Sequence, residues 1–83
     1  MDHKAISKPF DADILAAATE RAKNYVIVVE PSEELGFVGH GMKFPTVFGD
    51  GKTEEECRDS VREAITGAIA AMIEMGREEF IPD

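Results

Sequence analysis

Cysteine, tyrosine and tryptophan are scarce: the 83 residues include one cysteine, one tyrosine and no tryptophan. With Cys57 alone the chain cannot form an intrachain disulfide, and free thiols are typical of the reducing cytoplasm. The first residues carry Lys4 and Lys8 but lack the apolar run of a signal peptide, and no stretch is long enough to span a membrane. We therefore expect a cytoplasmic protein with no membrane attachment.

Basic residues are also few. Lysine and arginine number 9 against 17 acidic residues, which gives a formal net charge of −8. Nucleic-acid affinity comes largely from lysine and arginine side chains that displace counterions from phosphates, so this balance disfavours direct nucleic-acid binding. It favours a basic protein as the partner. The alternative is that the acids only keep a small protein soluble.

Soft metal ligands are limited to His3, His40 and Cys57, which lie far apart in the sequence. A zinc site needs several such ligands close together, so we expect no metal site. Cys57 falls on an apolar helical stripe, where burial raises the pKa of a thiol and disfavours the reactive thiolate. Ser32 and Ser60 have no histidine at a suggestive spacing. Nucleophilic catalysis is therefore not expected.

Two further patterns have a structural explanation. The segment 49–53 (GDGKT) ends with the lysine and threonine of a phosphate-binding loop, but the glycine spacing of that loop is absent and Asp50 adds a negative charge. A turn followed by a helix cap accounts for the segment.

Acidic residues could form a two-metal nuclease site, yet the first expected strand has no acid before Glu30, and the helix acids follow the solvent face. We expect no enzyme, no catalytic residue and no cofactor.

Hydrophobic residues make up 43% of the chain, enough for one small globular domain. Residues 1–9 lack periodicity and are expected to form a flexible tail. Residues 10–22 predict an N-terminal helix, for which Asp11 is a suitable N-cap. Such a short helix is unstable alone in water, so it must pack on another element. Its apolar stripe consists of Ile14, Leu15, Ala18 and Ala22.

The remaining residues, 23–83, predict one α+β domain. A run at 25–30 (YVIVVE) is apolar on both faces, as in a strand that is covered on both sides. Residues 31–36 predict a turn and 37–42 a second strand. Val47 and Phe48 predict a short third strand, which Pro45 separates from the second. We expect a three-stranded antiparallel meander.

A long helix follows the strands. Thr53 and Glu56 have the spacing of a capping box, and Gly76 stands where a left-handed C-cap is expected. Between them, charged residues fall mostly opposite an apolar face. Residues 80–82 are expected to add a short final strand. The apolar face comprises Cys57, Val61, Ala64, Ile65, Ala68, Ile69 and Met72.

One helix can cover only one face of the sheet. The other face, which has apolar residues of its own, is left for the N-terminal helix or for a second subunit. A chain of this length builds a thin core, so burial through self-association is a common source of extra stability. We therefore expect a homodimer or another homo-oligomer.

From residue 25 onward the sequence resembles the N-terminal domain of the HicB antitoxin family. The resemblance covers residues 25–82 and implies three antiparallel strands, a long helix and a short final strand. This fold is related to ribonuclease H but lacks its catalytic acids. The expected helix at 10–22 lies outside the family pattern. The similar pieces are, in order, YVIVVEP at 25–31, EE at 33–34, GFV at 36–38, FPTV at 44–47, GKT at 51–53, EE at 55–56 and GREEFIP at 76–82.

Members of this family bind and silence a small, basic, RNA-cleaving toxin called HicA, and they assemble as dimers or higher oligomers. The resemblance therefore implies a non-catalytic, antitoxin-like domain with a HicA-like protein partner. Many members also carry a C-terminal DNA-binding segment. The sequence ends at Asp83, where such a segment would begin, so operator binding is not expected. The alternative is an orphan HicB-like regulatory or small-ligand-binding module without a toxin partner.

Phe37 and Phe48 are the candidate partner-binding residues, because buried aromatic side chains tend to dominate the energetics of interfaces. Ordinary packing in the core is the alternative for both side chains.

Overall fold

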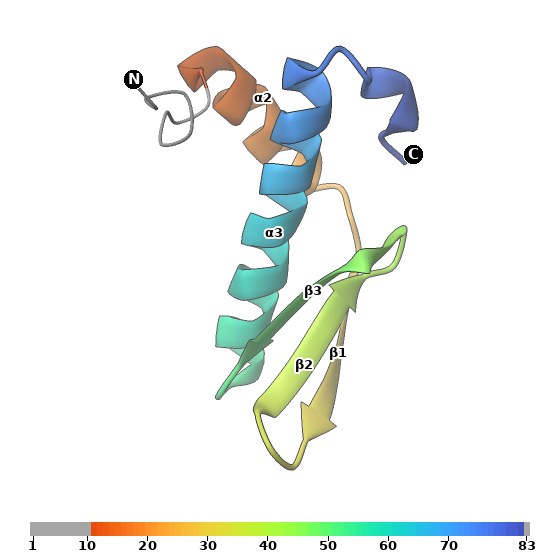
Figure 1. Ribbon diagram of the computed structural model, residues 1–83. Helices are drawn as coiled ribbons and strands as arrows, with labels where there is room; N and C mark the ends of the chain where they lie inside the picture. Colours follow the sequence, from red (N-terminus) through yellow and green to blue (C-terminus); the bar gives the residue numbers. More distant parts are fainter. Residues whose placement is uncertain (1–10, 83) are drawn as a thin grey trace, which may run out of the picture.

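The computed structural model describes residues 11–82, which form a three-stranded sheet, two α-helices and a short 3-10 helix (Figure 1). The predicted tail at 1–9, His3 and the start of the N-terminal helix at residue 10 lie outside the described residues. The α+β class is confirmed. In chain order the elements are α2 (Ala12–Ala22), β1 (Ile27–Ser32), β2 (Gly36–Gly41), β3 (Phe44–Gly51), α3 (Glu54–Glu74) and η1 (Glu78–Phe80).

The sheet is the predicted antiparallel meander, with strand order β1-β2-β3. Its strand limits differ from the prediction at the prolines. β1 continues through Pro31 to Ser32, and β3 begins at Phe44 and contains Pro45. Both prolines are tolerated because β1 and β3 are edge strands, where a missing N–H can point away from the ladder. The β1–β2 loop closes at Gly36, whose φ of 94° lies in the left-handed region that favours glycine.

Both predicted caps of the long helix α3 are present. The Thr53 Oγ1 atom accepts a hydrogen bond from the Glu56 backbone N–H at 3.1 Å. The Glu56 carboxylate reaches the Lys52 N–H at 3.0 Å, one residue before the position that a capping box uses. At the other end Gly76 has φ 71°, and the N–H groups of Gly76 and Arg77 donate to the carbonyls of Ile73 and Met72. This is a Schellman motif, which ends the helix sharply.

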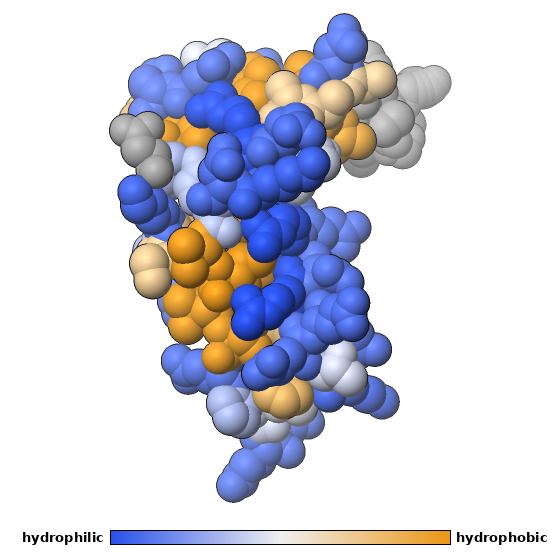
Figure 2. All heavy atoms as spheres, turned by 180° about the vertical axis from the view of Figure 1, so that it is seen from behind, coloured by the Kyte–Doolittle hydropathy of each residue, from blue (hydrophilic) through white to orange (hydrophobic). Residues whose placement is uncertain are grey.

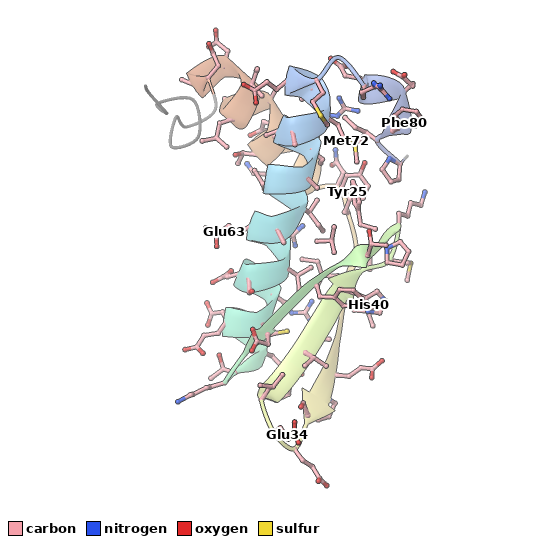
Figure 3. All side chains as sticks on the ribbon, viewed as in Figure 1. Tyr25, Glu34, His40, Glu63, Met72 and Phe80 are labelled. Carbon is pink, nitrogen blue, oxygen red and sulfur yellow. The ribbon has the colours of Figure 1, made fainter. Side chains whose placement is uncertain are left out.

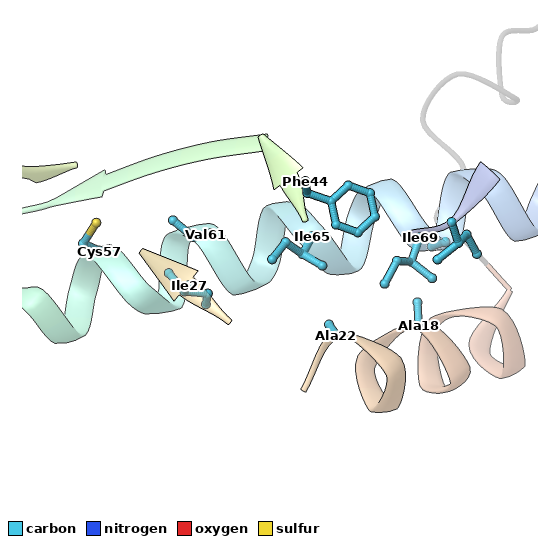
Figure 4. Close-up of a cluster of buried hydrophobic side chains, with 10 residues drawn as sticks. Ala18, Ala22, Ile27, Phe44, Cys57, Val61, Ile65 and Ile69 are labelled. Atoms are coloured by element: carbon cyan, nitrogen blue, oxygen red, sulfur yellow. The ribbon is translucent and has the colours of Figure 1, made fainter. Parts of the chain in front are cut away.

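The core lies along a single face of α3 (Figure 4). From the start of the helix to just past its middle, Cys57, Val61 and Ile65 are fully buried against the sheet, which contributes Ile27 and Phe44. Glycines on the facing side of the sheet allow this close approach. A Cβ atom on Gly39 would lie 3.0 Å from the Cys57 Sγ atom, closer than side-chain contacts normally permit.

The N-terminal helix α2 packs on the second half of α3 and contacts none of the described strands. Its residues Ala18 and Ala22 are fully buried, with Ala18 beside Ile69 and Ala22 between Ile65 and Ile69 (Figure 4). Of the two covers expected for the second face of the sheet, the N-terminal helix or a second subunit, the first is therefore wrong. Arg62 is one of the charged residues of α3 that were expected mostly opposite its apolar face, yet it is half-buried and donates to the carbonyls of Ala22 and Tyr25 at 2.8 and 3.2 Å.

The predicted final strand at 80–82 is also wrong. Within the described residues Phe80 ends the 3-10 helix η1, Ile81 follows with extended backbone at a bend, and the segment joins no sheet. Ile81 is buried, and the Tyr25 hydroxyl donates to the Pro82 carbonyl. Pro82 has no N–H to give to a ladder, and the left-handed Gly76 turns the chain back toward the α2–β1 connection.

The close packing of α3 on the sheet predicts a contrast between two glycines. A Cβ on Gly51 would lie 2.6 Å from the Cys57 backbone nitrogen, whereas a Cβ on Gly67 meets nothing within 4 Å. Gly51→Ala should therefore destabilise the fold by about 1–3 kcal/mol. Gly67→Ala, inside α3, should stabilise it by about 0.5–1 kcal/mol. Urea denaturation followed by circular dichroism measures both changes. Equal effects would contradict this helix–sheet contact.

Candidate interaction surface

The sheet face that points away from α3 is the candidate functional site, and we call it the outer face. Side chains alternate between the two faces of a strand. Phe44 and Val47 pack in or against the core, and the glycines at 39, 41, 49 and 51 lie under α3, so the remaining positions point outward. The outer face consists of Val26, Val28, Glu30, Val38, His40, Met42, Phe48 and Asp50.

Much of the outer face is hydrophobic and open to solvent. Phe48 is 68% exposed, Val26 58% and Met42 57%. Among the described elements only α3 packs against the strands, and it does so from the opposite side. Figure 2 shows a contiguous hydrophobic area at the height of the sheet, bordered by hydrophilic side chains. Scattered apolar side chains are normal on a protein surface, whereas a contiguous patch indicates an interaction site.

Two cross-strand rows organise the outer face. In one, Val28 pairs with His40 and His40 with Phe48. The His40 and Phe48 rings lie 6.4 Å apart between centroids at an interplanar angle of 55°. Figure 3 shows His40 on the side of the sheet away from α3, whereas Glu63 projects from the far side of that helix. This row provides the aromatic part of the surface.

The second row places acids beside an apolar centre. Glu30 pairs with Val38, and Val38 pairs with Asp50. Beyond this row lies the β1–β2 loop, where Glu33 and Glu34 are exposed and Glu34 extends from the tip (Figure 3). One end of the outer face is therefore negative, while its middle is apolar.

The hollows on this side are small. One of about 320 Å³ is lined by Leu35, Val38, Phe48, Gly49 and Asp50. Another of about 220 Å³ lies where the β2–β3 loop meets Tyr25 and Val26. Pockets that enclose drug-sized ligands are typically about 300–1,000 Å³. The surface therefore fits the side chains of a protein better than an enclosed small molecule.

The two predicted anchors lie on opposite faces of the sheet. Phe37 is half-buried and packs against the core, so ordinary packing describes it. Phe48 lies exposed on the outer face. Sequence reasoning did not select Val26, Val38 or Met42, although the run of residues at 25–30 that is apolar on both faces was the signal for a second buried or contacting surface.

The residues considered for catalysis remain apart. Cys57 is fully buried, and burial, reinforced by the nearby Asp50 charge, raises the pKa of its thiol despite the opposing effect of Arg58. No three metal-ligating side chains come together within residues 11–82. The start of α3 uses its own Thr53 and Glu56 side chains as caps, which leaves these positions engaged within the chain.

No protein-family model matches the chain, and neither curated proteins nor solved structures give a match. The HicB resemblance thus depends on the residue pattern from 25 to 82. None of the described helices is long and apolar enough to cross a membrane.

The two phenylalanines should respond differently to truncation. Loss of a fully buried phenylalanine costs about 3–5 kcal/mol, and the half-buried Phe37→Ala should cost about half of that. Phe48→Ala should change the free energy of unfolding by less than about 0.5 kcal/mol, because most of this side chain is already exposed to solvent. Urea unfolding of the two variants measures the difference. A larger loss for Phe48→Ala would contradict the outward position of this ring.

Proposed function

We propose that the protein is a non-catalytic, antitoxin-like binding domain that holds a basic protein on its outer face. The observation that carries this proposal is the exposed hydrophobic sheet face around Phe48 and Val26, which no described element covers. A HicA-like toxin, which is small, basic and RNA-cleaving, is the partner that the resemblance at 25–82 favours.

The apolar part of the outer face supplies affinity. Full burial of a phenylalanine or valine side chain contributes about 1.5–3 kcal/mol. Phe48 has most of its surface still to bury, and Val26 and Met42 have more than half. Aromatic side chains in the middle of a contact commonly dominate binding energy. Phe48, supported from one side by His40, is suited to this role.

The acidic end supplies charge complementarity. Glu30 and Asp50 flank Val38 on the outer face, and Glu33 and Glu34 extend the negative charge along the loop. The whole chain carries a formal net charge of −8. Lysine and arginine side chains of an RNA-cleaving protein would be attracted to this end, and an acidic binder competes with RNA for them. The same charge disfavours nucleic acid as the ligand.

An orphan regulatory module that binds a small ligand is less well supported. Its site would have to be one of the hollows of about 320 and 220 Å³, which are at or below the size of a pocket that encloses such a ligand. A broad apolar face with acids at one end fits a macromolecular contact better.

Binding is tested by co-expression with the product of a short, basic gene beside this one. If that product stops growth, the wild-type protein should restore it and copurify with the product. Phe48→Glu should weaken binding at least about tenfold, because it buries a charge in an apolar contact. Met75→Gln is the matched control, since Met75 is 66% exposed at the distant end of α3.

The association rate should fall as salt rises, because screening at 0.15 M limits steering to about 8 Å. Equal binding by wild type and Phe48→Glu would contradict the assigned surface. Retention of duplex DNA at physiological salt, with no basic protein bound, would contradict the proposed partner class.

We also expect no nuclease activity. Glu30 and Asp50 are separated by Val38 across the sheet, and no third acid or histidine joins them within the described residues. Two-metal cleavage requires carboxylates that share ions about 3.5–4 Å apart. RNA, DNA and hybrid substrates should remain intact with Mg²⁺ or Mn²⁺. Cleavage that copurifies with the wild type and disappears in Glu30→Gln would show that this expectation is wrong.

A further inference from the structure

The edge of β1 that faces away from β2 is a second surface that no described element covers, and it is distinct from the outer face. β1 is an outer strand of the sheet, and among the described elements only β2 and α3 contact it. α3 packs mainly over β2 and β3, where the glycines allow its approach. An edge strand presents a row of backbone donors and acceptors that can pair with another strand.

The hydrogen-bond alternation identifies which groups face the open edge. The Val26 carbonyl accepts from the Met42 N–H at 2.9 Å, so Val26 points its backbone toward β2. In an antiparallel ladder the direction alternates along the strand. Val28 and Glu30 therefore also point toward β2, whereas the N–H and C=O groups of Ile27 and Val29 point outward. Pro31 would be next in this outward series but has no N–H to offer.

We propose that a second copy of this chain pairs with the edge, β1 against β1 and antiparallel, about a two-fold axis at Val28. In this register Ile27 of each copy lies opposite Val29 of the other. The outward N–H and C=O groups of both residues then all find partners. The two sheets, each of three strands, become one continuous sheet.

Other registers are less favourable. An axis at Val29 would place Ile27 opposite Pro31 and lose a donor. An axis at Glu30 would place two carboxylates directly opposite each other, which is destabilising. An axis at Ile27 would require pairing at Tyr25, whose backbone carbonyl accepts from Arg62. The axis at Val28 places Glu30 opposite Val26 and avoids all three conflicts.

The side chains on both faces also fit this contact. On the inner face Val29 is only half-buried, and Ile27 of the second copy would lie beside it. On the outer face the two Val28 side chains would meet, which joins the two His40–Phe48 rows into one longer surface. A closed two-fold contact needs such self-complementarity. The contact leaves the outer face open, so the proposed function does not depend on it.

The opposite edge, β3, is less suited to pairing. It contains Pro45, and its ladder with β2 is interrupted by an irregularity between His40 and Gly41. Prolines and bulges are devices that protect sheet edges from pairing. β1 has an unbroken β-branched run at 27–29 and meets its proline only at position 31.

Disulfide trapping tests the register directly. Opposed residues in a non-hydrogen-bonded antiparallel pair have Cα atoms about 4.5 Å apart, within the range of about 4.4–6.8 Å that disulfides span. Val28→Cys should therefore form a covalent dimer under mild oxidation with copper phenanthroline, even at low protein concentration. Val38→Cys is the matched control, because it lies on the same face but on the central strand. The native Cys57 is buried and stays in both variants.

Sedimentation from about 1 µM to about 1 mM provides the second measurement. The wild type should approach twice its 9.1 kDa mass. Val28→Lys should remain monomeric, because it would place two like charges opposite each other across the axis. Val38→Lys should still dimerise. Because each copy is acidic, dimerisation should strengthen with salt, opposite to partner binding. A monomeric wild type, or equal trapping of Val28→Cys and Val38→Cys, would overturn the proposal. If the wild type forms the dimer but binds no basic protein, that result would instead contradict the proposed function alone.

Discussion

The structure depends on the direct contact between α3 and the glycine-bearing inner face of the sheet. A Cβ on Gly49 would lie 2.6 Å from the Ser60 Oγ atom, and a Cβ on Gly51 equally close to the Cys57 nitrogen. Because β3 lacks side chains at these points, the small residues of α3 can reach its backbone. The buried core is consequently a thin layer along one face of α3. A small set of side chains makes the van der Waals contacts within it.

This contact also decides which surfaces stay open. α3 packs over the glycines of β2 and β3, whose close contacts with the helix extend as far as Ile65, and Phe44 of β3 lies between Ile65 and Ile69 (Figure 4). The later part of α3 extends past the strands and provides the site for α2, whose alanines permit close packing. The outer face and the β1 edge are then left uncovered by the described chain. Both candidate contacts therefore follow from the position of one helix.

Local signals in the sequence predicted the elements better than their contacts. Thr53, Glu56 and Gly76 predicted where the long helix begins and ends, since capping involves neighbouring residues only. The positions of α2 and Arg62 depend on packing partners distant in sequence, which no local pattern contains. Phe48 shows the same limit: Phe44 points inward, and strict alternation would turn Phe48 inward too. The irregularity between His40 and Gly41 breaks that alternation and places Phe48 on the outer face.

The outer face is polarised along its strands, and this restricts how a partner can bind. Glu30 and Asp50 stand toward the β1–β2 loop, whereas Val26 and Met42 occupy the opposite end. On a single copy of the chain, a basic partner that placed its charges over Val26 and Met42 would bury them without counter-charges, which is strongly unfavourable. With its basic residues over Glu30 and Asp50, and its apolar residues over Phe48 and Val26, both kinds of group find complements. For the proposed basic partner, the outer face of one copy therefore favours a single orientation, in which charge would set the approach and apolar burial would supply most of the affinity.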